Sequence, residues 1–589
     1  MSKKPAKIPT WNLADLYKST DCLELKNDLS ETTDSVQRFA NLYKGKIKQL
    51  HADMLATAIS EYEEIHDVLG RLSSFAYLLY AEDLSKPENT AFYQDISEKV
   101  NAISTSILFF SLEINKISDN ELKEKLNASK KLQHYQPWLR DIRVMRPYQL
   151  SDEVEEILHE KSITSHHSWS RFFDETLAGL EFHVGKKTLS TAEAFHMLSS
   201  PKADKREKAA NAIGKTLKAN IKTFTFITNI LAKDKEIEDK KRNFPQPISA
   251  RNLSNLIEDE VTEALISTVK ANYPDLSHRY YKIKAKWLGM KKLNSWDRNA
   301  PIPGKKNQEI PWKKAVDIVL ESYNDFSPQM ATIGKRFFDE KWIDGGVRKG
   351  KESGAFSHPT VPSAHPYILM NYQGNTRDVM TLAHELGHGV HQVLAAKQGA
   401  LMSDTPLTLA ETASVFGEQL TFRNLLAREK NEKQRKIMIA GKVEDMLNTV
   451  VRQVAFCEFE RRVHDARRSG EIPTAAISKI WIDVQKESLG SAIKFEDEYK
   501  YYWSYIPHFI HSPFYVYAYA FGECLVNSLY KVYEEKPDGF AEKYIKMLEA
   551  GGTLRHKELL APFGLDSSNP DFWQGGLDVI SGFIDELEG

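Results

Sequence analysis

The sequence is poor in cysteine and carries almost no net charge. Its 589 residues include 3 cysteines, Cys22, Cys457 and Cys524, which are too few and too dispersed for a disulfide framework or a cysteine zinc site. Such usage is typical of a reducing compartment. The formal net charge of −2 gives no electrostatic basis for binding nucleic acid. We therefore expect no nucleic-acid partner.

Long apolar runs are also missing. No segment approaches the roughly 18 apolar residues that a membrane-spanning helix needs. Residues 1–7 are basic and no apolar segment follows them, so we expect no secretory signal. Together with the cysteine usage, these absences predict a cytoplasmic protein with no membrane partner.

Most of the chain has the pattern of amphipathic helices. Between residues 11 and 130, apolar side chains recur at three- and four-residue steps, as they do at Val68, Leu72 and Phe75. Strand signals are scarce. Because 589 residues exceed the size of a single hydrophobic core, we expect two or more domains.

The best strand candidate is the segment 366–372, which is short, rich in β-forming residues and closed by Gln373-Gly374-Asn375. It directly precedes the most informative stretch of the chain. One interpretation is a sheet edge on which an extended peptide could pair its backbone. The other is a buried core strand, and the sequence favours neither.

The stretch 381–392 contains the motif His-Glu-x-x-His. On a helix, His384 and His388 share one face, because residues four apart lie about 40° apart around the axis. Both imidazoles can then reach one zinc ion, while Glu385 acts on a water at that ion instead of binding the metal. Apolar residues surround the motif at helical spacing, and polar groups placed among them need a partner.

A third metal ligand must come from further along the chain. One zinc-protease plan places it six residues after the second histidine, where this sequence has Leu394, so that plan is excluded. His391 could be an alternative ligand or could hydrogen-bond one. In a second plan, a glutamate from a following helix completes the site. The pair Thr405-Pro406 is a good start for such a helix.

Two glutamates in that helix are candidates, Glu411 and Glu418. They lie seven residues apart and therefore on nearly the same helix face. Glu411 stands among small and apolar residues, where a lone carboxylate is costly without a cation. We assign Glu411 as the ligand and Glu418 as a carboxylate that hydrogen-bonds a ligand histidine, although geometry alone also permits the reverse.

Three segments together resemble oligoendopeptidase F, a branch of the thimet-oligopeptidase-like metallopeptidases. They are His-Glu-Leu-Gly-His at 384–388, Ala-Glu-Thr-Ala-Ser at 410–414, and Ile506-Pro507-His508 followed by the aromatic run 514–519. The resemblance covers nearly the whole chain. It implies a mainly α, elongated, two-lobed zincin with a deep substrate channel and a small β-sheet next to the His-Glu-x-x-His helix. It also implies one Zn²⁺ per chain and short unstructured peptides as substrates.

By this resemblance, His508, Tyr515 and Tyr517 are groups that stabilise the transition state or contact the substrate. A tyrosine hydroxyl near zinc can donate to a developing oxyanion without adding a net charge. In a helix, Tyr515 and Tyr519 share a face while Tyr517 points away, and Pro513 prevents the helical phase from extending back to His508. Aromatic packing is the alternative interpretation for each tyrosine.

The motif predicts a zinc peptidase, and the resemblance implies a zinc-dependent endopeptidase. We expect residues 1–198 to form an N-terminal helical domain and residues 199–589 to form the catalytic domain. His384, His388 and Glu411 would hold zinc, and Glu385 would be the general base. Two alternatives stay open, a zinc carboxypeptidase on a similar helical scaffold and a non-catalytic helical scaffold that keeps a metal for stability.

Overall fold

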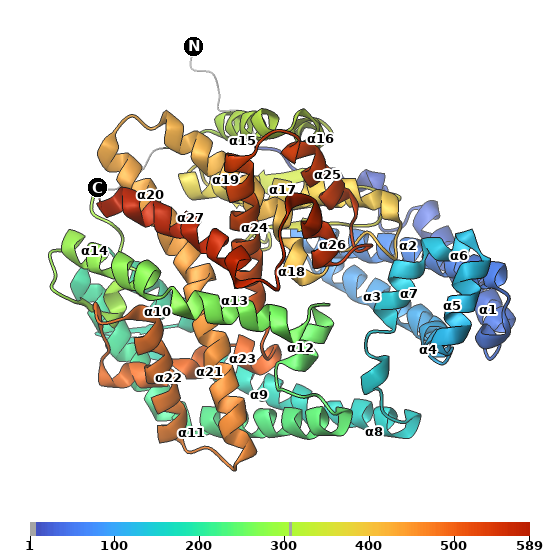
Figure 1. The fold of residues 1–589 in the computed structure, drawn as a ribbon, viewed down its shortest axis with the longest axis horizontal. Helices are drawn as coiled ribbons and strands as arrows, with labels where there is room; N and C mark the ends of the chain where they lie inside the picture. The colour runs from blue at the N-terminus through green and yellow to red at the C-terminus, as the bar shows by residue number, and fades with distance from the viewer. Residues whose placement is uncertain (1–7, 305–308, 589) are drawn as a thin grey trace. The chain divides into compact units, whose positions relative to one another are not determined.

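The computed structural model describes residues 8–304 and 309–588, and most of them are helical (Figure 1). The prediction of a mainly α fold with small sheets is confirmed. The basic N-terminal stretch 1–7 lies outside the described residues. Within the described ranges, no helix combines the length and the apolar character that a membrane crossing requires.

Two compact units interleave along the chain. One comprises residues 1–146, 307–428 and 532–565, and the other comprises residues 147–306, 429–531 and 566–589. The predicted division into residues 1–198 and 199–589 does not coincide with these units and stays a prediction. We call the first of these compact units the metal-site unit and the second the arginine unit, for features described below.

The metal-site unit contains helices from all three of its chain segments. Its elements are Leu23–Tyr43 (α1), Ala52–Glu82 (α2), Pro87–Ile107 (α3), Phe109–Asn115 (α4), Asp119–Ala128 (α5), Lys130–His134 (α6), Gln136–Ile142 (α7), Trp312–Phe326 (α15), Pro328–Asp339 (α16), Ile343–Gly346 (β4), Phe356–His358 (β5), Tyr367–Tyr372 (β6), Thr376–Ala395 (α17), Leu407–Ala410 (α18), Thr412–Arg428 (α19), Phe540–Glu549 (α25) and His556–Leu560 (α26).

The arginine unit is likewise helical. Its elements are Asp152–Ser162 (α8), His166–Ala178 (α9), Phe182–Val184 (β1), Lys187–Leu189 (β2), Thr191–His196 (α10), Ala203–Arg242 (α11), Ser249–Ser254 (α12), Asp259–Ala271 (α13), Arg279–Trp287 (α14), Leu293–Asn294 (β3), Glu432–Thr449 (α20), Val451–Arg468 (α21), Thr474–Leu489 (α22), Ile493–Lys494 (β7), His508–His511 (α23) and Pro570–Glu588 (α27). The remaining helix, Tyr517–Glu535 (α24), contains the division between residues 531 and 532.

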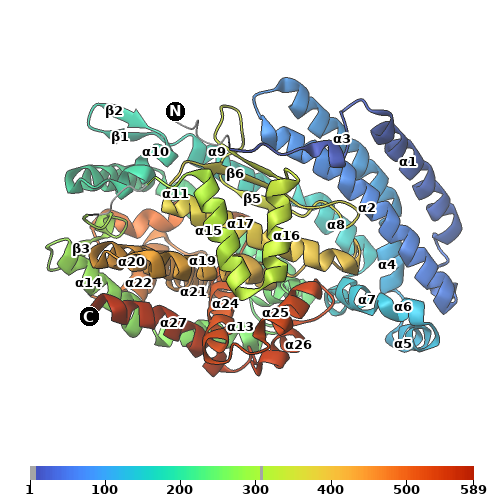
Figure 2. The same ribbon diagram turned by 90° about the horizontal axis from the view of Figure 1, so that it is seen from above.

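In the metal-site unit, α1, α2 and α3 pack together around an aromatic core. Phe39, Tyr62 and Phe110 form its centre, with ring centroids 4.9 to 6.2 Å apart. Leu55, Ile59 and Leu69 of α2 are buried beside them, as the three- and four-residue spacing predicts. Elsewhere in this unit, α15 and α16 lie side by side and both pack on α17 (Figure 2).

A small three-stranded sheet lies against α17, as the resemblance implies. The strand order is β4-β6-β5, with β4 parallel and β5 antiparallel to β6. The predicted strand 366–372 is therefore β6, but it is the central strand, and all of its residues except Asn371 are buried. The sheet-edge interpretation of this segment is wrong, because both of its backbone edges are already paired. The edge strand beside α17 is β5.

The glycine-dense loop before β6 is held by one buried lysine. The ammonium of Lys351 donates to Asp344 Oδ1 at 2.9 Å and to the carbonyl oxygens of Asp344, Gly346 and Met370 at 2.6 to 3.0 Å. Its side chain and that of Asp344 are both fully buried. Because the charge is paired and every donor bond is satisfied, this burial is tolerated and it fastens the loop to β4 and β6.

Candidate metal centre

The helix α17 begins with a capping box. The side chain of Asn375 accepts a hydrogen bond from the backbone N–H of Asp378 at 3.1 Å, and the Asp378 carboxylate accepts one from the N–H of Asn375 at 3.1 Å. This reciprocal pair satisfies two of the donors that every helix start leaves open. The helix then continues to Ala395, so the helical interpretation of the His-Glu-x-x-His segment is confirmed.

Close backbone packing sets the spacing between α17 and α19. A Cβ atom on Gly387 would lie 2.5 Å from the carbonyl oxygen of Ala413 and 2.7 Å from the Cα of Ser414, distances that no side chain tolerates. Tyr323 donates a hydrogen bond of 2.6 Å to the carbonyl oxygen of Ala383 on the motif helix. The main chains of the two helices can therefore approach closely enough for their side chains to share one ion.

Glu411 lies at the junction between two helices and not inside one. The short α18 starts directly after Pro406 without a side-chain capping bond, and it ends at Ala410. Glu411 then connects α18 to α19 with near-helical backbone angles. Ser414 Oγ donates a hydrogen bond of 2.7 Å to Glu411 Oε2, which orients the carboxylate toward α17.

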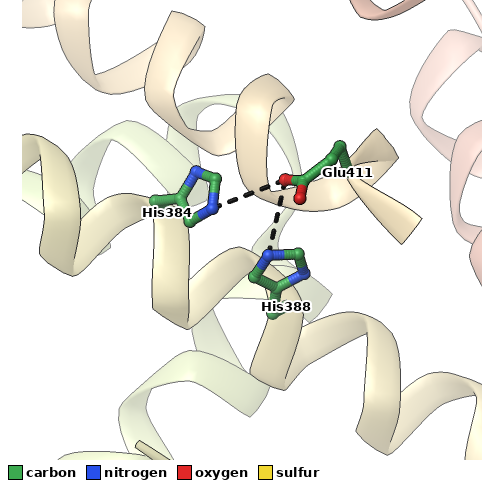
Figure 3. Close-up of side chains that lie close together, drawn as sticks. All are labelled: His384, His388 and Glu411. Atoms are coloured by element: carbon green, nitrogen blue, oxygen red, sulfur yellow. Dashed lines mark ion pairs between the residues drawn. The ribbon is translucent and has the colours of Figure 1, made fainter. Parts of the chain in front are cut away.

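His384, His388 and Glu411 form a group that can hold a metal ion (Figure 3). The Nε2 atoms of His384 and His388 lie 3.4 and 3.5 Å from Glu411 Oε2. Ligands at about 2.05 Å in a tetrahedral zinc site are about 3.3 Å apart, so the two measured distances fit zinc. The side chains are 19 to 29% exposed, which leaves them within reach of solvent.

Glu418 approaches the other side of His384. Its Oε1 lies 2.6 Å from His384 Nδ1, and this contact fixes the tautomer in which Nδ1–H donates and Nε2 offers its lone pair. Burial lowers the pKa of His384, but the hydrogen bond and charge of Glu418 outweigh it and raise that pKa to about 9. Burial lowers the pKa of His388. The placement supports Glu411 as ligand and Glu418 as orienting carboxylate.

Glu385 lies beside the group without joining it. Its side chain is 6% exposed. Burial raises the pKa of Glu385 to about 7, with the carboxylates of Glu411 and Glu418 adding to the rise and His384 opposing it. A carboxyl group held next to a metal group but outside its ligand set is the arrangement that a general base needs.

His391 is not a member of the metal group formed by the described residues. It is buried at 6% exposure, and burial lowers its pKa to about 4, with the nearby His388 adding to the effect. The next residue, Gln392, exchanges two hydrogen bonds with Ser357, at 2.9 and 3.2 Å. This contact ties the edge strand β5 to the metal helix.

The other predicted site residues, His508, Tyr515 and Tyr517, belong to the arginine unit. The rings of His508 and Tyr515 are 6.0 Å apart, and the hydroxyl of Tyr519 lies 3.4 Å from His508 Nε2. Tyr515 and Tyr519 are 5.3 Å apart. Their predicted common orientation is therefore observed. The cluster includes Tyr519, which was not among the predicted site residues although its spacing from Tyr515 pointed to it.

Tyr517 has a different environment. Its side chain is fully buried, and its hydroxyl accepts a hydrogen bond of 2.8 Å from Asn255. Burial raises the pKa of this hydroxyl above its usual value. A side chain enclosed in this way has no surface for a substrate, so the placement supports core packing for Tyr517 and argues against the contact role that the resemblance suggested.

The turn before Tyr515 is strained and specifically held. Phe514 has a φ of 60°, a left-handed conformation that costs a bulky residue roughly 1–2 kcal/mol. Its backbone N–H donates to Glu460 Oε1 at 2.8 Å, and Arg251 Nε donates to the carbonyl oxygen of Pro513 at 3.2 Å. Glu460 itself is 2% exposed, and burial raises its pKa to about 8. These contacts position Tyr515 in the turn just before α24.

Comparison with known protein families gives two matches. The sequence model of peptidase family M3 matches residues 196–579, and that of oligopeptidase F matches residues 113–182. The first match covers well over half of the chain and contains every residue of the metal group. The predicted resemblance is thereby confirmed.

Individual relatives match along the full length. Oligopeptidase PepF of Bacillus subtilis is 26% identical, over 98% of this chain and 87% of its own. An oligoendopeptidase F homologue of Borreliella burgdorferi is also 26% identical, over 98% of this chain and 97% of its own.

Among solved structures, oligoendopeptidase F from Enterococcus faecium has a TM-score of 0.71 at 22% identity, covering 97% of this chain and 99% of that one. A crystal structure from Chlamydophila abortus has a TM-score of 0.88 at 24% identity, covering 98% and 97%. At these identities the two structures show the shared fold.

Proposed function

Because the chain belongs to peptidase family M3 and is a metallopeptidase, we propose that it is a zinc-dependent endopeptidase that cuts internal bonds of short, unstructured peptides. The observation that carries this proposal is the convergence of two imidazole nitrogens and one carboxylate oxygen on a single point, with Glu385 held beside them. A metal kept only for stability would not require that additional buried carboxyl group. The names of the relatives, oligopeptidase and oligoendopeptidase, support peptides as the substrate class.

The proposed mechanism divides the work between zinc and the chain. Bound zinc would lower the pKa of a water molecule and polarise the scissile carbonyl. His384, His388 and Glu411 would hold the ion, and Glu418 keeps His384 in the required tautomer. Glu385 would accept a proton from the attacking water and deliver it to the leaving amine.

We assign a supporting role to His508 and Tyr515. Donors aimed at a developing oxyanion each contribute about 10²–10³ in rate in enzymes where one has been removed. The contact between the two rings and the specifically held turn before Tyr515 support this assignment. Tyr517, carried over with them, is better explained by its buried hydrogen bond to Asn255.

The same proposal includes the organisation and location of the chain. Residues 199–589 would form the catalytic part, supported by the position of the metal group, and residues 1–198 an N-terminal helical part. Three free cysteines, two of them buried, are consistent with the cytoplasm as location.

The test compares the wild-type protein with Glu385→Gln on a mixed peptide library and on a folded protein, with and without a chelator. Mass spectrometry maps every cut, and zinc content is assayed in parallel. We expect internal cuts in short peptides, none in the folded protein, and loss of cutting with the chelator. Glu385→Gln should keep zinc and lose about 10²–10⁴ in turnover, whereas the exposed Glu432→Gln should behave as wild type.

Three results would contradict the proposal in different ways. Near-normal hydrolysis by Glu385→Gln removes the general base. Stepwise loss of residues from the carboxyl end indicates a carboxypeptidase. A zinc-loaded protein that cuts no peptide, and that unfolds when a chelator is added, indicates a metal-stabilised scaffold.

A further inference from the structure

The arginine unit contains a cavity of about 220 Å³ that the metal centre does not use. Residues from α10, α21, α22 and the turns 295–299 and 497–505 line it. Its walls are largely aromatic, and two guanidinium groups, those of Arg298 and Arg452, face into it. The lining contains no aspartate or glutamate. We call this cavity the arginine pocket.

Neither guanidinium has a direct ion-pair partner among the described residues, although the negative charge of Glu444 acts on Arg298 from a distance. Among residues 8–304 and 309–588, no hydrogen bond or ion pair joins the side chain of Arg298 or Arg452 to another group, and Arg452 Nε is buried without an acceptor. The nearest stabilising contact is the ring of Phe456, 4.9 Å from the Arg452 guanidinium carbon. Arginine stays charged in proteins, so two like charges share one cavity without a direct counter-ion, which is costly.

The carboxylates around the pocket already have partners. Asp297 accepts from Arg206 at 2.6 Å, in a pair whose side chains are 5% and 1% exposed. Glu444 accepts from Lys284 and, at 2.6 Å, from Tyr280. Glu496 accepts from Ser295 at 2.5 Å and keeps one buried oxygen without a partner. None of the three carboxylates bonds to Arg298 or Arg452.

The same contacts hold the pocket in shape. The Arg206–Asp297 pair fixes the turn that precedes Arg298, and Lys284 donates to the carbonyl oxygen of Arg298 at 2.6 Å. On the opposite wall, Trp481 donates to the carbonyl oxygen of Tyr499 at 3.1 Å. The pocket is therefore preorganised, and an entering group would need little rearrangement of the protein.

The pocket is electrostatically linked to the aromatic cluster of the same unit. Burial lowers the pKa of His508, and the positive charge of Arg452 lowers it further. Tyr505, which also lines the pocket, is three residues before His508 in the chain. A ligand charge in the pocket would therefore act on a residue that we assign to substrate contact.

We propose that the arginine pocket binds a carboxylate group through Arg298 and Arg452. A planar guanidinium matches a carboxylate with two parallel hydrogen bonds, and the aromatic walls suit an apolar body behind the charged group. Two sources share this chemistry, the C-terminus of a short peptide and a small free carboxylic acid. The peptide source rests on the proposed function, whereas the free-acid source does not.

The experiment measures binding without turnover. Full-length, zinc-loaded Glu385→Gln protein is titrated calorimetrically with one hexapeptide ending in a free carboxylate and with the same hexapeptide ending in an amide. Sodium acetate and inorganic phosphate are tested separately by thermal unfolding. Each measurement is repeated with Arg452→Gln and with Arg298→Gln added. Arg171→Gln is the matched control, because it removes the same charge from an exposed side chain of the same unit.

We expect the acid peptide to bind at least 10-fold more tightly than the amide, the range for a charge-assisted hydrogen bond. Either pocket substitution should abolish this preference, and Arg171→Gln should not. If acid and amide bind equally but acetate raises the melting temperature only while both arginines are present, the free acid is the source. A response to phosphate alone overturns the carboxylate assignment. Equal behaviour of the pocket variants and the Arg171→Gln control in every arm overturns the site.

Discussion

The metal centre and the arginine pocket solve the problem of buried charge in opposite ways. At the metal centre, imidazoles and carboxylates lie together, and Glu418 and Glu411 contact the two histidines at 2.6 to 3.5 Å. In the pocket, Arg298 and Arg452 share a cavity with no acidic lining residue. At the metal centre the ionisable groups already contact one another, whereas the two guanidiniums of the pocket have no ion-pair partner among the described residues.

The difference teaches what each site selects. A mixed set of donors at tetrahedral spacing suits a small cation. A pair of guanidiniums with aromatic walls suits an anion attached to an apolar body. Removing a carboxylate should therefore weaken ligand binding at the metal centre, whereas removing a cation should weaken it in the pocket.

The largest expected effect concerns the two glutamates of the metal centre. Glu411→Ala removes a ligand, so the purified variant should contain almost no zinc by metal analysis. Glu418→Ala removes only the hydrogen bond that orients His384 and should weaken zinc binding by about 10- to 100-fold. The opposite ranking would exchange the roles of the two carboxylates.

A second prediction distinguishes Tyr515 from Tyr517, both in the arginine unit. Tyr515→Phe should lower kcat by about 10²-fold with the melting temperature unchanged, because it removes a donor from the proposed oxyanion site. Tyr517→Phe should instead leave kcat within a few-fold and destabilise the fold by about 1 kcal/mol, since the buried amide of Asn255 loses its acceptor. Peptide hydrolysis rates and thermal unfolding separate the two roles, and equal kinetic defects would restore Tyr517 to the site.

A third prediction concerns the pH dependence of stability and Glu460, a buried carboxyl group of the arginine unit. Its pKa rises from 4.5 to about 8 on folding, so the folded state binds the extra proton between these values. The stability it contributes is complete below pH 4.5 and is lost as the pH rises to 8, by up to about 1.4 kcal/mol per pH unit. Glu460→Gln, neutral throughout, should flatten urea-unfolding free energies between pH 5 and 8.

The control for this pH series is Glu175→Gln, which changes an exposed glutamate and should keep the wild-type slope. If the slopes of all three proteins coincide, Glu460 is already ionised in the folded state.

The sequence alone predicts those parts of the site that depend on residues close together in the chain. His384 and His388 are one helical turn apart, so their common face follows from helix geometry alone. Which of Glu411 and Glu418 binds the metal, and which orients His384, depends on how α19 packs against α17. The spacing of residues in the sequence does not reveal that packing. The face shared by Tyr515 and Tyr519 was predictable, but the enclosure of Tyr517 by Asn255 depends on a contact 262 residues away in the chain.

The difference between local and long-range information also explains why the sheet-edge interpretation of the fold was wrong. The segment 366–372 has the composition of a strand, and composition does not reveal how many neighbours a strand has. Its second neighbour, β5, is only three residues long and gave no detectable pattern. Arg298 and Arg452 are ordinary surface residues by type, and only tertiary packing brings them into one cavity.

Because Gly387 allows the main chains of α17 and α19 to lie in contact, the main chain helps to determine which metal ion the site prefers. Replacement by alanine would place a Cβ atom 2.5 and 2.7 Å from backbone atoms of α19, and the shift that relieves these contacts is larger than the tolerance of about 0.2 Å in a metal–ligand bond. Divalent ions differ in size and in preferred geometry. A change of one hydrogen atom into a methyl group, at a residue that binds nothing, could therefore alter which ion the peptidase retains.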